Sequence, residues 1–166
     1  LLHALGARVL AYDINPQPAY ESFLTYVDKE TLLAESDIVS LHVDLNPSSV
    51  GLLNAADFER MPAHAGLVNA SRGPVVNTDA LITALMSGEI EAAALDTVEG
   101  ESAVFNHDLR QQGVADQRIQ QLLDLPNVIM TPHVAFYTNL AVQNMIDIAL
   151  DDVLLIIQGQ PALHEI

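Results

Sequence analysis

The sequence has 166 residues, of which 50% are hydrophobic, and its 22 acidic residues outnumber 6 basic ones to give a formal net charge of −16. A chain of this size can bury one sizeable core as a single domain, while its charge excludes nucleic acids and anionic membranes as partners. It contains no cysteine, no apolar run of the roughly 18 residues that cross a bilayer and no basic leader, so we expect a cytoplasmic protein without disulfides.

Short β-branched runs alternate with amphipathic segments along the chain. This pattern is typical of a parallel sheet covered by helices, so we predict an α/β fold. In chain order, the predicted elements are a helical remnant over 1–6, strands over 8–14, 37–43 and 66–71, a helix over 78–87, a strand over 92–98, a short helix near 117–123, a strand over 127–133 and a helix over 138–158.

Two of the predicted helices carry clear end signals. Asn77 or Thr78 can cap the helix over 78–87, and Gly88 can stop it. The last predicted helix stops at Gly159.

In an open parallel sheet, ligands bind at the carboxyl ends of the strands, so the residues just past each strand are candidates for the site. Asp13 lies at the end of the first predicted strand, where a Rossmann unit keeps the carboxylate that binds the adenosine ribose and rejects a 2′-phosphate. Taken alone, an acidic residue there can equally be a solvated loop residue.

Arg72 follows the third predicted strand, in the run Asn-Ala-Ser-Arg-Gly-Pro of residues 69–74. A guanidinium held there is a rigid two-pronged donor for a carboxylate. Because the chain has so few basic residues, Arg72 does not belong to a general basic surface. An ordinary turn arginine is the alternative.

The last two predicted strands lead to acidic and imidazole side chains. Asp96 lies near the end of the fourth strand, Glu101 follows five residues later, and His133 ends the fifth strand in the run Thr-Pro-His. Glu99 shares the turn with Glu101, so either carboxylate can be merely solvated, and a histidine at this position can be structural. The histidines show no spacing typical of a metal site, so we expect no bound metal.

Together these motifs resemble the D-isomer-specific 2-hydroxy acid dehydrogenases. The resemblance rests on residues 68–73 (Val-Asn-Ala-Ser-Arg-Gly), on 95–97 (Leu-Asp-Thr) followed by Glu101, and on 127–133 (Asn-Val-Ile-Met-Thr-Pro-His). It covers essentially the whole chain. It implies a Rossmann-like doubly wound parallel sheet that binds NAD, in an enzyme that interconverts a D-2-hydroxy acid and a 2-keto acid by hydride transfer.

The resemblance also implies a role for each site residue. Arg72 would anchor the substrate carboxylate, Glu101 would orient His133, and His133 would act as acid and base because imidazole titrates near neutral pH. Phe136 would line the substrate pocket, with packing at a helix start as its alternative. The residues implied to bind the cofactor are Tyr12, Asp13, Val43, Asn69, Ala70, Ser71 and Asp96.

Within the family, the long connection over 100–126 and Ser102 after Glu101 resemble the D-lactate dehydrogenase branch, since other branches usually have proline after this glutamate. Pyruvate or a slightly larger 2-keto acid is therefore the expected substrate. Asp44 departs from the family, which commonly has proline there. A nonenzymatic NAD-linked binding or regulatory module is the alternative function, although such a module needs no positioned proton donor.

The glycine-rich turn of the family, Gly-x-Gly-x-x-Gly, does not occur in the sequence. We therefore expect a C-terminal fragment of a longer homodimeric protein, with an NAD-binding domain over 1–150 and a return segment to the substrate domain over 151–166. The first strand of the family would lie between the strands over 8–14 and 37–43, so unpaired edges are expected there. The fragment alone is expected to be inactive.

Overall fold

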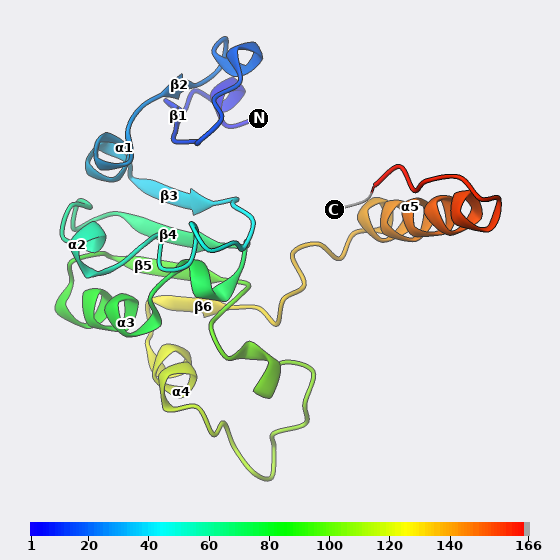
Figure 1. The fold of residues 1–166 in the computed structure, drawn as a ribbon. Helices are drawn as coiled ribbons and strands as arrows, with labels where there is room; N and C mark the ends of the chain where they lie inside the picture. Colours follow the sequence, from blue (N-terminus) through cyan, green and yellow to red (C-terminus); the bar gives the residue numbers. More distant parts are fainter. Residues whose placement is uncertain (165–166) are drawn as a thin grey trace. The chain divides into compact units, whose positions relative to one another are not determined.

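The computed structural model describes residues 1–164 of the chain. It has two compact units, the first ending at Pro132 and the second beginning at His133. Four parallel strands form the main sheet of the first unit, in the order β3-β4-β5-β6 (Figure 1). They are β3 (Ile38–Leu41), β4 (Gly66–Asn69), β5 (Ala92–Leu95) and β6 (Val128–Met130).

The four strands of the main sheet end in one row. Leu41 pairs with Asn69, Asn69 with Leu95, and Leu95 with Met130. The last four predicted strands are thus confirmed, but each is shorter than expected because the chain leaves the ladder after this row. The loops that follow these four strands therefore all begin at the same edge of the sheet, which is where ligands bind in parallel α/β sheets.

A separate two-stranded parallel sheet lies near the start of the chain, formed by β1 (Leu10–Ala11) and β2 (Thr25–Tyr26). β1 is the middle of the strand predicted over 8–14, of which only these two residues are paired. β2 is not predicted from the sequence, because two residues carry no periodicity. Among residues 1–164 no pairing joins β1 to β3, so the expected interruption between them is confirmed (Figure 1).

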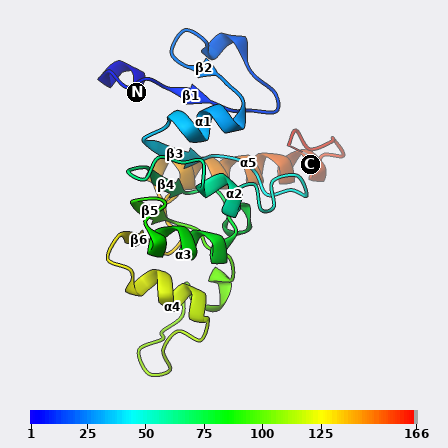
Figure 2. The ribbon, with the colours of Figure 1, turned by 90° about the vertical axis from the view of Figure 1, so that its left-hand side faces the viewer.

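Four α-helices belong to the first unit: α1 (Lys29–Glu35), α2 (Ala55–Phe58), α3 (Thr78–Ser87) and α4 (Gln117–Asp124). Each contacts the next, and Figure 2 shows them following one another along the sheet. α3 and α4 confirm two predictions, whereas α1 and α2 are too short for a sequence pattern to reveal. Single 3-10 turns occur at His3–Leu5, which is all that forms of the predicted helical remnant, and at Pro18–Tyr20, Gly73–Val75 and Glu101–Ala103.

The limits of α3 follow from its end residues. Asn77 is its cap, because the Asn77 side chain accepts a hydrogen bond from the Ala80 N–H at 2.9 Å, while Thr78 is buried. Gly88 ends the helix in the left-handed conformation, with φ 76°, which glycine adopts without strain.

The hydrophobic core lies between the main sheet and the helices. Leu67 of β4 is almost fully buried, and each such leucine or phenylalanine stabilises the fold by about 1.5–3 kcal/mol. This core holds the strand ends in place. The largest other buried apolar side chains are Leu33 of α1, Leu53, Phe58 of α2, Val75, Ile90, and Ile119 and Leu122 of α4.

One ion pair is buried where α1 meets α2. Lys29 Nζ lies 2.8 Å from Asp57 Oδ1 and donates a hydrogen bond to the Leu52 carbonyl at 3.1 Å. Asp57 Oδ2 accepts a further hydrogen bond from the Asn54 N–H at 3.0 Å, and only 5% of the Asp57 side chain is exposed. The buried charge of the Asp57 carboxylate is therefore stabilised by Lys29 and the Asn54 N–H, and not by water.

Asp57→Ala is expected to lower the free energy of unfolding by about 3–5 kcal/mol, because it leaves the Lys29 ammonium group uncompensated in a largely buried position. Urea unfolding followed by circular dichroism measures the change. Asp108→Ala is the matched control, since it removes an exposed ion pair with Arg110 and should have little effect. Equal losses in the two variants would contradict the prediction.

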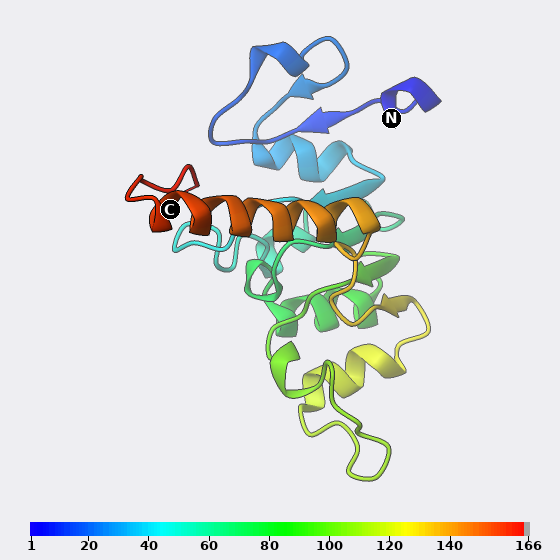
Figure 3. The same ribbon diagram turned by 90° about the vertical axis from the view of Figure 1, so that its right-hand side faces the viewer.

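The second unit consists of α5 (Asn139–Ile157) with a short segment on either side. Thr138 caps this helix and Gly159 follows its end with φ 74°, so the helix predicted over 138–158 is confirmed. Figure 3 shows α5 as one continuous helix. Within residues 1–164, no helix combines the length and the apolar character that crossing a membrane requires.

Candidate active site

Hydrogen bonds continue for one residue beyond the row of strand ends. The Asp96 N–H donates to the Asn69 carbonyl at 2.8 Å, and the Thr131 N–H donates to the Leu95 carbonyl at 3.0 Å. The Thr131 hydroxyl also donates to Asp96 Oδ1 at 2.5 Å. Asp96 is thus fixed at the carboxyl edge of the sheet, with 7% of its surface exposed.

The side chain of Asn69 organises the turn after β4. Its Oδ1 accepts hydrogen bonds from the Ser71 N–H at 3.0 Å and from the Ser71 hydroxyl at 2.9 Å, and its Nδ2 donates to the Arg72 carbonyl at 3.2 Å. Asn69 and Ser71 are buried, whereas Ala70 and Arg72 are exposed. Of the three residues expected to contact the cofactor in this run, only Ala70 therefore offers an exposed surface.

Gly73 brings the turn of Arg72 against the turn that leads to Glu101. A Cβ atom on Gly73 would lie 2.2 Å from the Val98 carbonyl carbon and 2.4 Å from the Glu99 nitrogen, closer than any real side chain approaches. On the far side of this contact, Glu101 Oε2 accepts a hydrogen bond from the Val98 N–H at 2.8 Å. Arg72 and Glu101 therefore stand on adjoining turns.

Glu99, the other carboxylate of this turn, is bonded to Arg118. It accepts a hydrogen bond from Arg118 Nη1 at 2.9 Å, and Arg118 also pairs with Asp116, the cap of α4, at 3.3 Å. The hydrogen bond from Arg118 holds the pKa of the Asp116 carboxyl below its usual value. The stability that Asp116 contributes is therefore present above its ordinary pKa and is lost as the pH falls through the lowered one.

Thr97 lies between Asp96 and the Gly73 contact, and 1% of its surface is exposed. Its Oγ1 has no hydrogen-bond partner among the described residues. A buried hydroxyl in this state costs about 1–3 kcal/mol of desolvation. The position thus lowers the stability of the turn that carries Glu101.

Thr97→Val is expected to raise the melting temperature, with a gain of about 1 kcal/mol, because valine keeps the shape and removes the unsatisfied hydroxyl. The same substitution at Thr131 should lower the melting temperature, since it removes the hydroxyl that donates to Asp96. Scanning calorimetry of both variants compares the two signs. A loss at Thr97 as large as the loss at Thr131 would contradict the prediction.

The remaining residues expected at the cofactor follow β1 and β3. Tyr12 and Asp13 come directly after β1 and are exposed, and Asp13 Oδ1 accepts a hydrogen bond from the Asn15 N–H at 2.8 Å. Val43, two residues beyond β3, is partly buried and packs against the core. Each of them lies just past the carboxyl end of a strand, whereas the prediction placed them in the last residues of longer strands.

His133 opens the second unit in a left-handed backbone conformation, with φ 54°. Histidine enters this region more readily than most residues, yet the conformation is strained. Its imidazole contacts the ring of Phe136 edge-on, with centroids 6.2 Å apart and planes at 82°, and Phe136 contacts Tyr137 in the same way at 6.0 Å. The second unit therefore brings His133 and Phe136 together, as the first unit does for Arg72 and Glu101.

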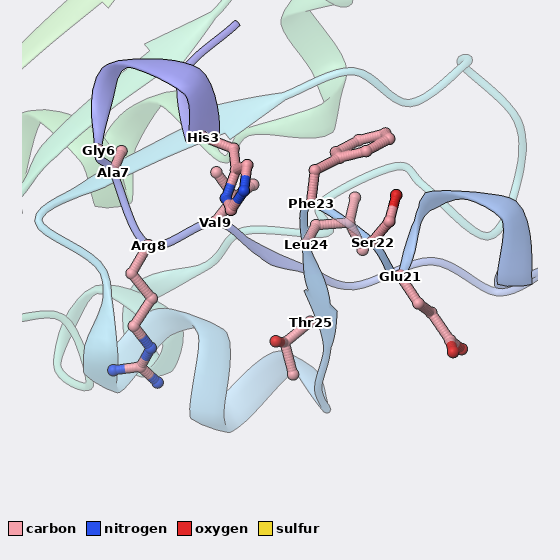
Figure 4. Close-up of a pocket in the computed structure, with 10 residues that line it drawn as sticks. All are labelled: His3, Gly6, Ala7, Arg8, Val9, Glu21, Ser22, Phe23, Leu24 and Thr25. Atoms are coloured by element: carbon pink, nitrogen blue, oxygen red, sulfur yellow. The ribbon is translucent and has the colours of Figure 1, made fainter.

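Figure 4 shows a pocket near the start of the chain. It has a volume of about 350 Å³, and its walls come from the segments around His3–Val9 and Glu21–Thr25. None of the predicted site residues of the described chain lines it, so the row of strand ends is the better candidate. Within residues 1–164, no group of three histidine, cysteine, aspartate or glutamate side chains could hold a metal ion.

Comparison with known proteins gives consistent matches over nearly the whole chain. Residues 1–135 match the family described as D-isomer specific 2-hydroxyacid dehydrogenase, NAD binding domain. The chain is 41% identical over 163 residues to a D-lactate dehydrogenase of Lactobacillus delbrueckii subsp. bulgaricus, a match that covers 98% of this chain and 49% of that protein. It is 36% identical over 166 residues to a D-lactate dehydrogenase of Treponema pallidum, with coverages of 100% and 50%.

Solved structures match in the same way. A D-lactate dehydrogenase from Sporolactobacillus superposes with a TM-score of 0.93 and 48% identity, covering 98% of this chain and 49% of that one. The NAD complex of a D-isomer specific 2-hydroxyacid dehydrogenase from Lactobacillus delbrueckii ssp. bulgaricus gives a TM-score of 0.87 and 44% identity, with coverages of 95% and 47%. The chain thus spans about half the length of the relatives it matches.

Proposed function

Because the chain belongs to the D-isomer specific 2-hydroxyacid dehydrogenase family, we propose that the protein containing it interconverts a D-2-hydroxy acid and a 2-keto acid with NAD. D-lactate and pyruvate are the proposed pair, since the curated relatives are named D-lactate dehydrogenases. The main support is the contact at Gly73, where the turn of Arg72 adjoins the turn of Glu101 at the carboxyl edge of the sheet.

We assign binding of the substrate carboxylate to Arg72. Arg72 is an exposed residue, and the hydrogen bond from its Nη1 to the Ser71 carbonyl at 2.7 Å restricts the direction of its guanidinium. Two parallel N–H donors match the two oxygens of a carboxylate and orient the adjacent keto carbon. A local donor is required because the net charge of −16 repels an anionic substrate.

We assign proton transfer to His133. During reduction the imidazole gives a proton to the keto oxygen, and during oxidation it takes that proton back. Glu101 is the proposed carboxylate that orients the imidazole. Phe136, which packs against the imidazole and is 45% exposed, is the proposed wall of the substrate pocket.

The bound cofactor would supply the hydride chemistry, as the donor NADH in the direction of reduction and as the acceptor NAD+ in the direction of oxidation. The exposed carboxylate of Asp13 after β1 suits the ribose hydroxyls and would repel a 2′-phosphate. No Gly-x-Gly-x-x-Gly turn for the pyrophosphate occurs in the 166 residues, so we expect the chain alone to be inactive. The other proposed cofactor contacts are Tyr12, Val43, Asn69, Ala70, Ser71 and Asp96. Asn69 and Ser71 would contribute backbone atoms only, because their side chains are buried and bond each other.

The proposal extends to the whole protein. Residues 1–150 are assigned to the NAD-binding domain and 151–166 to a segment that returns to the substrate domain. We propose a homodimer as the assembly of the complete protein, and light scattering that gives the mass of a monomer would overturn it.

The complete gene product that contains this chain tests the function directly. We expect NADH oxidation with pyruvate in an assay that also offers 2-ketobutyrate, hydroxypyruvate and phenylpyruvate. No turnover with any of them would overturn the proposal, and NADH binding without turnover would favour a nonenzymatic NAD-linked module. Equal rates with NADPH and NADH would contradict the role of Asp13.

A further inference from the structure

The carboxamide of Asn69 is bonded through both its oxygen and its nitrogen inside the turn that presents Arg72. Both of its oxygen lone pairs are used by Ser71, and its nitrogen donates to the Arg72 carbonyl. With 1% of its surface exposed, the Asn69 side chain is closed off from a bound molecule. It lies at the last paired position of β4, so it connects the rigid sheet directly to the turn.

Arg72 is restrained at three points. Its carbonyl oxygen is held by Asn69, its guanidinium is held by the Ser71 carbonyl, and the following Gly73 is pressed against the backbone of Val98. The Asn69 side chain makes the first restraint directly. It also shapes the second, because it bonds Ser71, whose carbonyl accepts from the guanidinium. Asn69 therefore controls two of the three.

We propose that Asn69 is a positioning residue, whose buried carboxamide sets the direction in which Arg72 presents its guanidinium to the carboxylate of a 2-keto acid. This inference rests on the proposed function, because it needs Arg72 as the anchor. It gives the Asn69 side chain a task other than cofactor contact. The amide provides two acceptor sites on its oxygen and a donor on its nitrogen, whereas an ionised carboxylate of the same shape has no donor.

Asn69→Asp is the sharpest test, measured in the complete gene product. Aspartate can still accept from Ser71, but it has no donor for the Arg72 carbonyl. We expect kcat/KM for pyruvate to fall by about 10- to 100-fold, mainly through KM, because a small misplacement of an anchoring group costs this much. The dissociation constant of NADH, measured by fluorescence titration, should stay within about twofold, which corresponds to well under 1.4 kcal/mol.

Asn77→Asp is the matched control. Asn77 also bonds the backbone three residues on, as the cap of α3, but it makes no bond with the Arg72 turn, and aspartate preserves a cap. We expect its kinetic constants to match those of the wild type. Ser71→Ala is the milder variant if Asn69→Asp does not fold, because it removes one hydroxyl bond to Asn69 and should raise KM in the same direction.

A double mutant separates positioning from general structure. If Asn69 acts through Arg72, Asn69→Asp should cost little more in kcat/KM once Arg72→Lys is present. Fully additive losses, an unchanged KM in Asn69→Asp, or an equal loss of NADH affinity would each overturn the inference while leaving the proposed function in place. An inactive wild type would overturn both.

Discussion

His133→Ala is expected to lower kcat for pyruvate by about 10²- to 10⁴-fold in the complete gene product, while NADH binding stays nearly intact. The imidazole is the proposed proton donor to the keto oxygen, and the methyl group of alanine cannot donate a proton. Steady-state kinetics and fluorescence titration of NADH measure the two quantities separately.

The unusual backbone of His133 requires a second variant. Its φ of 54° is costly for alanine but is tolerated by asparagine, so His133→Asn removes the proton donor while keeping the conformation. Both variants should lose the rate to a similar extent. His107→Ala is the control, because that imidazole is exposed and bonds the Ser102 carbonyl, which is not a proposed site group. Parallel loss of kcat and NADH affinity in both His133 variants would identify a structural histidine.

Gly73→Ala is expected to lower the free energy of unfolding by at least about 3 kcal/mol and to abolish activity. The new Cβ would lie 2.2–2.4 Å from three backbone atoms of Val98 and Glu99, so whole turns have to move apart. The turns that separate are those of Arg72 and Glu101. Urea unfolding and the pyruvate assay record the two effects.

Gly66→Ala is the control for this glycine. A Cβ there meets only the Ala92 carbonyl oxygen at 3.8 Å, an ordinary contact, and alanine loses less chain entropy than glycine in a strand. We expect Gly66→Ala to be as stable as the wild type or slightly more so. Similar stabilities of the Gly66 and Gly73 variants would show that the turns can adjust to a side chain, against the prediction.

The main elements of the fold were predictable because their signals are local. Periodicity located four strands of the main sheet and three helices, and glycines marked where α3 and α5 end. Long-range pairing decided the rest. The strand over 8–14 was predicted too long because only Leu10 and Ala11 find a partner, in β2, whose own two residues gave no pattern.

The sequence by itself determined the family, the order of the candidate residues and their places after successive strands, since parallel pairing brings all carboxyl ends to one edge. Only the tertiary structure decided how Arg72 is held. The close contact of Gly73 with Val98 and the burial of Asn69 both depend on how neighbouring strands pack. No local sequence pattern predicts how close those strands lie. A glycine and an asparagine in a turn are common in sequences. Gly73 and Asn69 become structurally required once β5 lies beside β4.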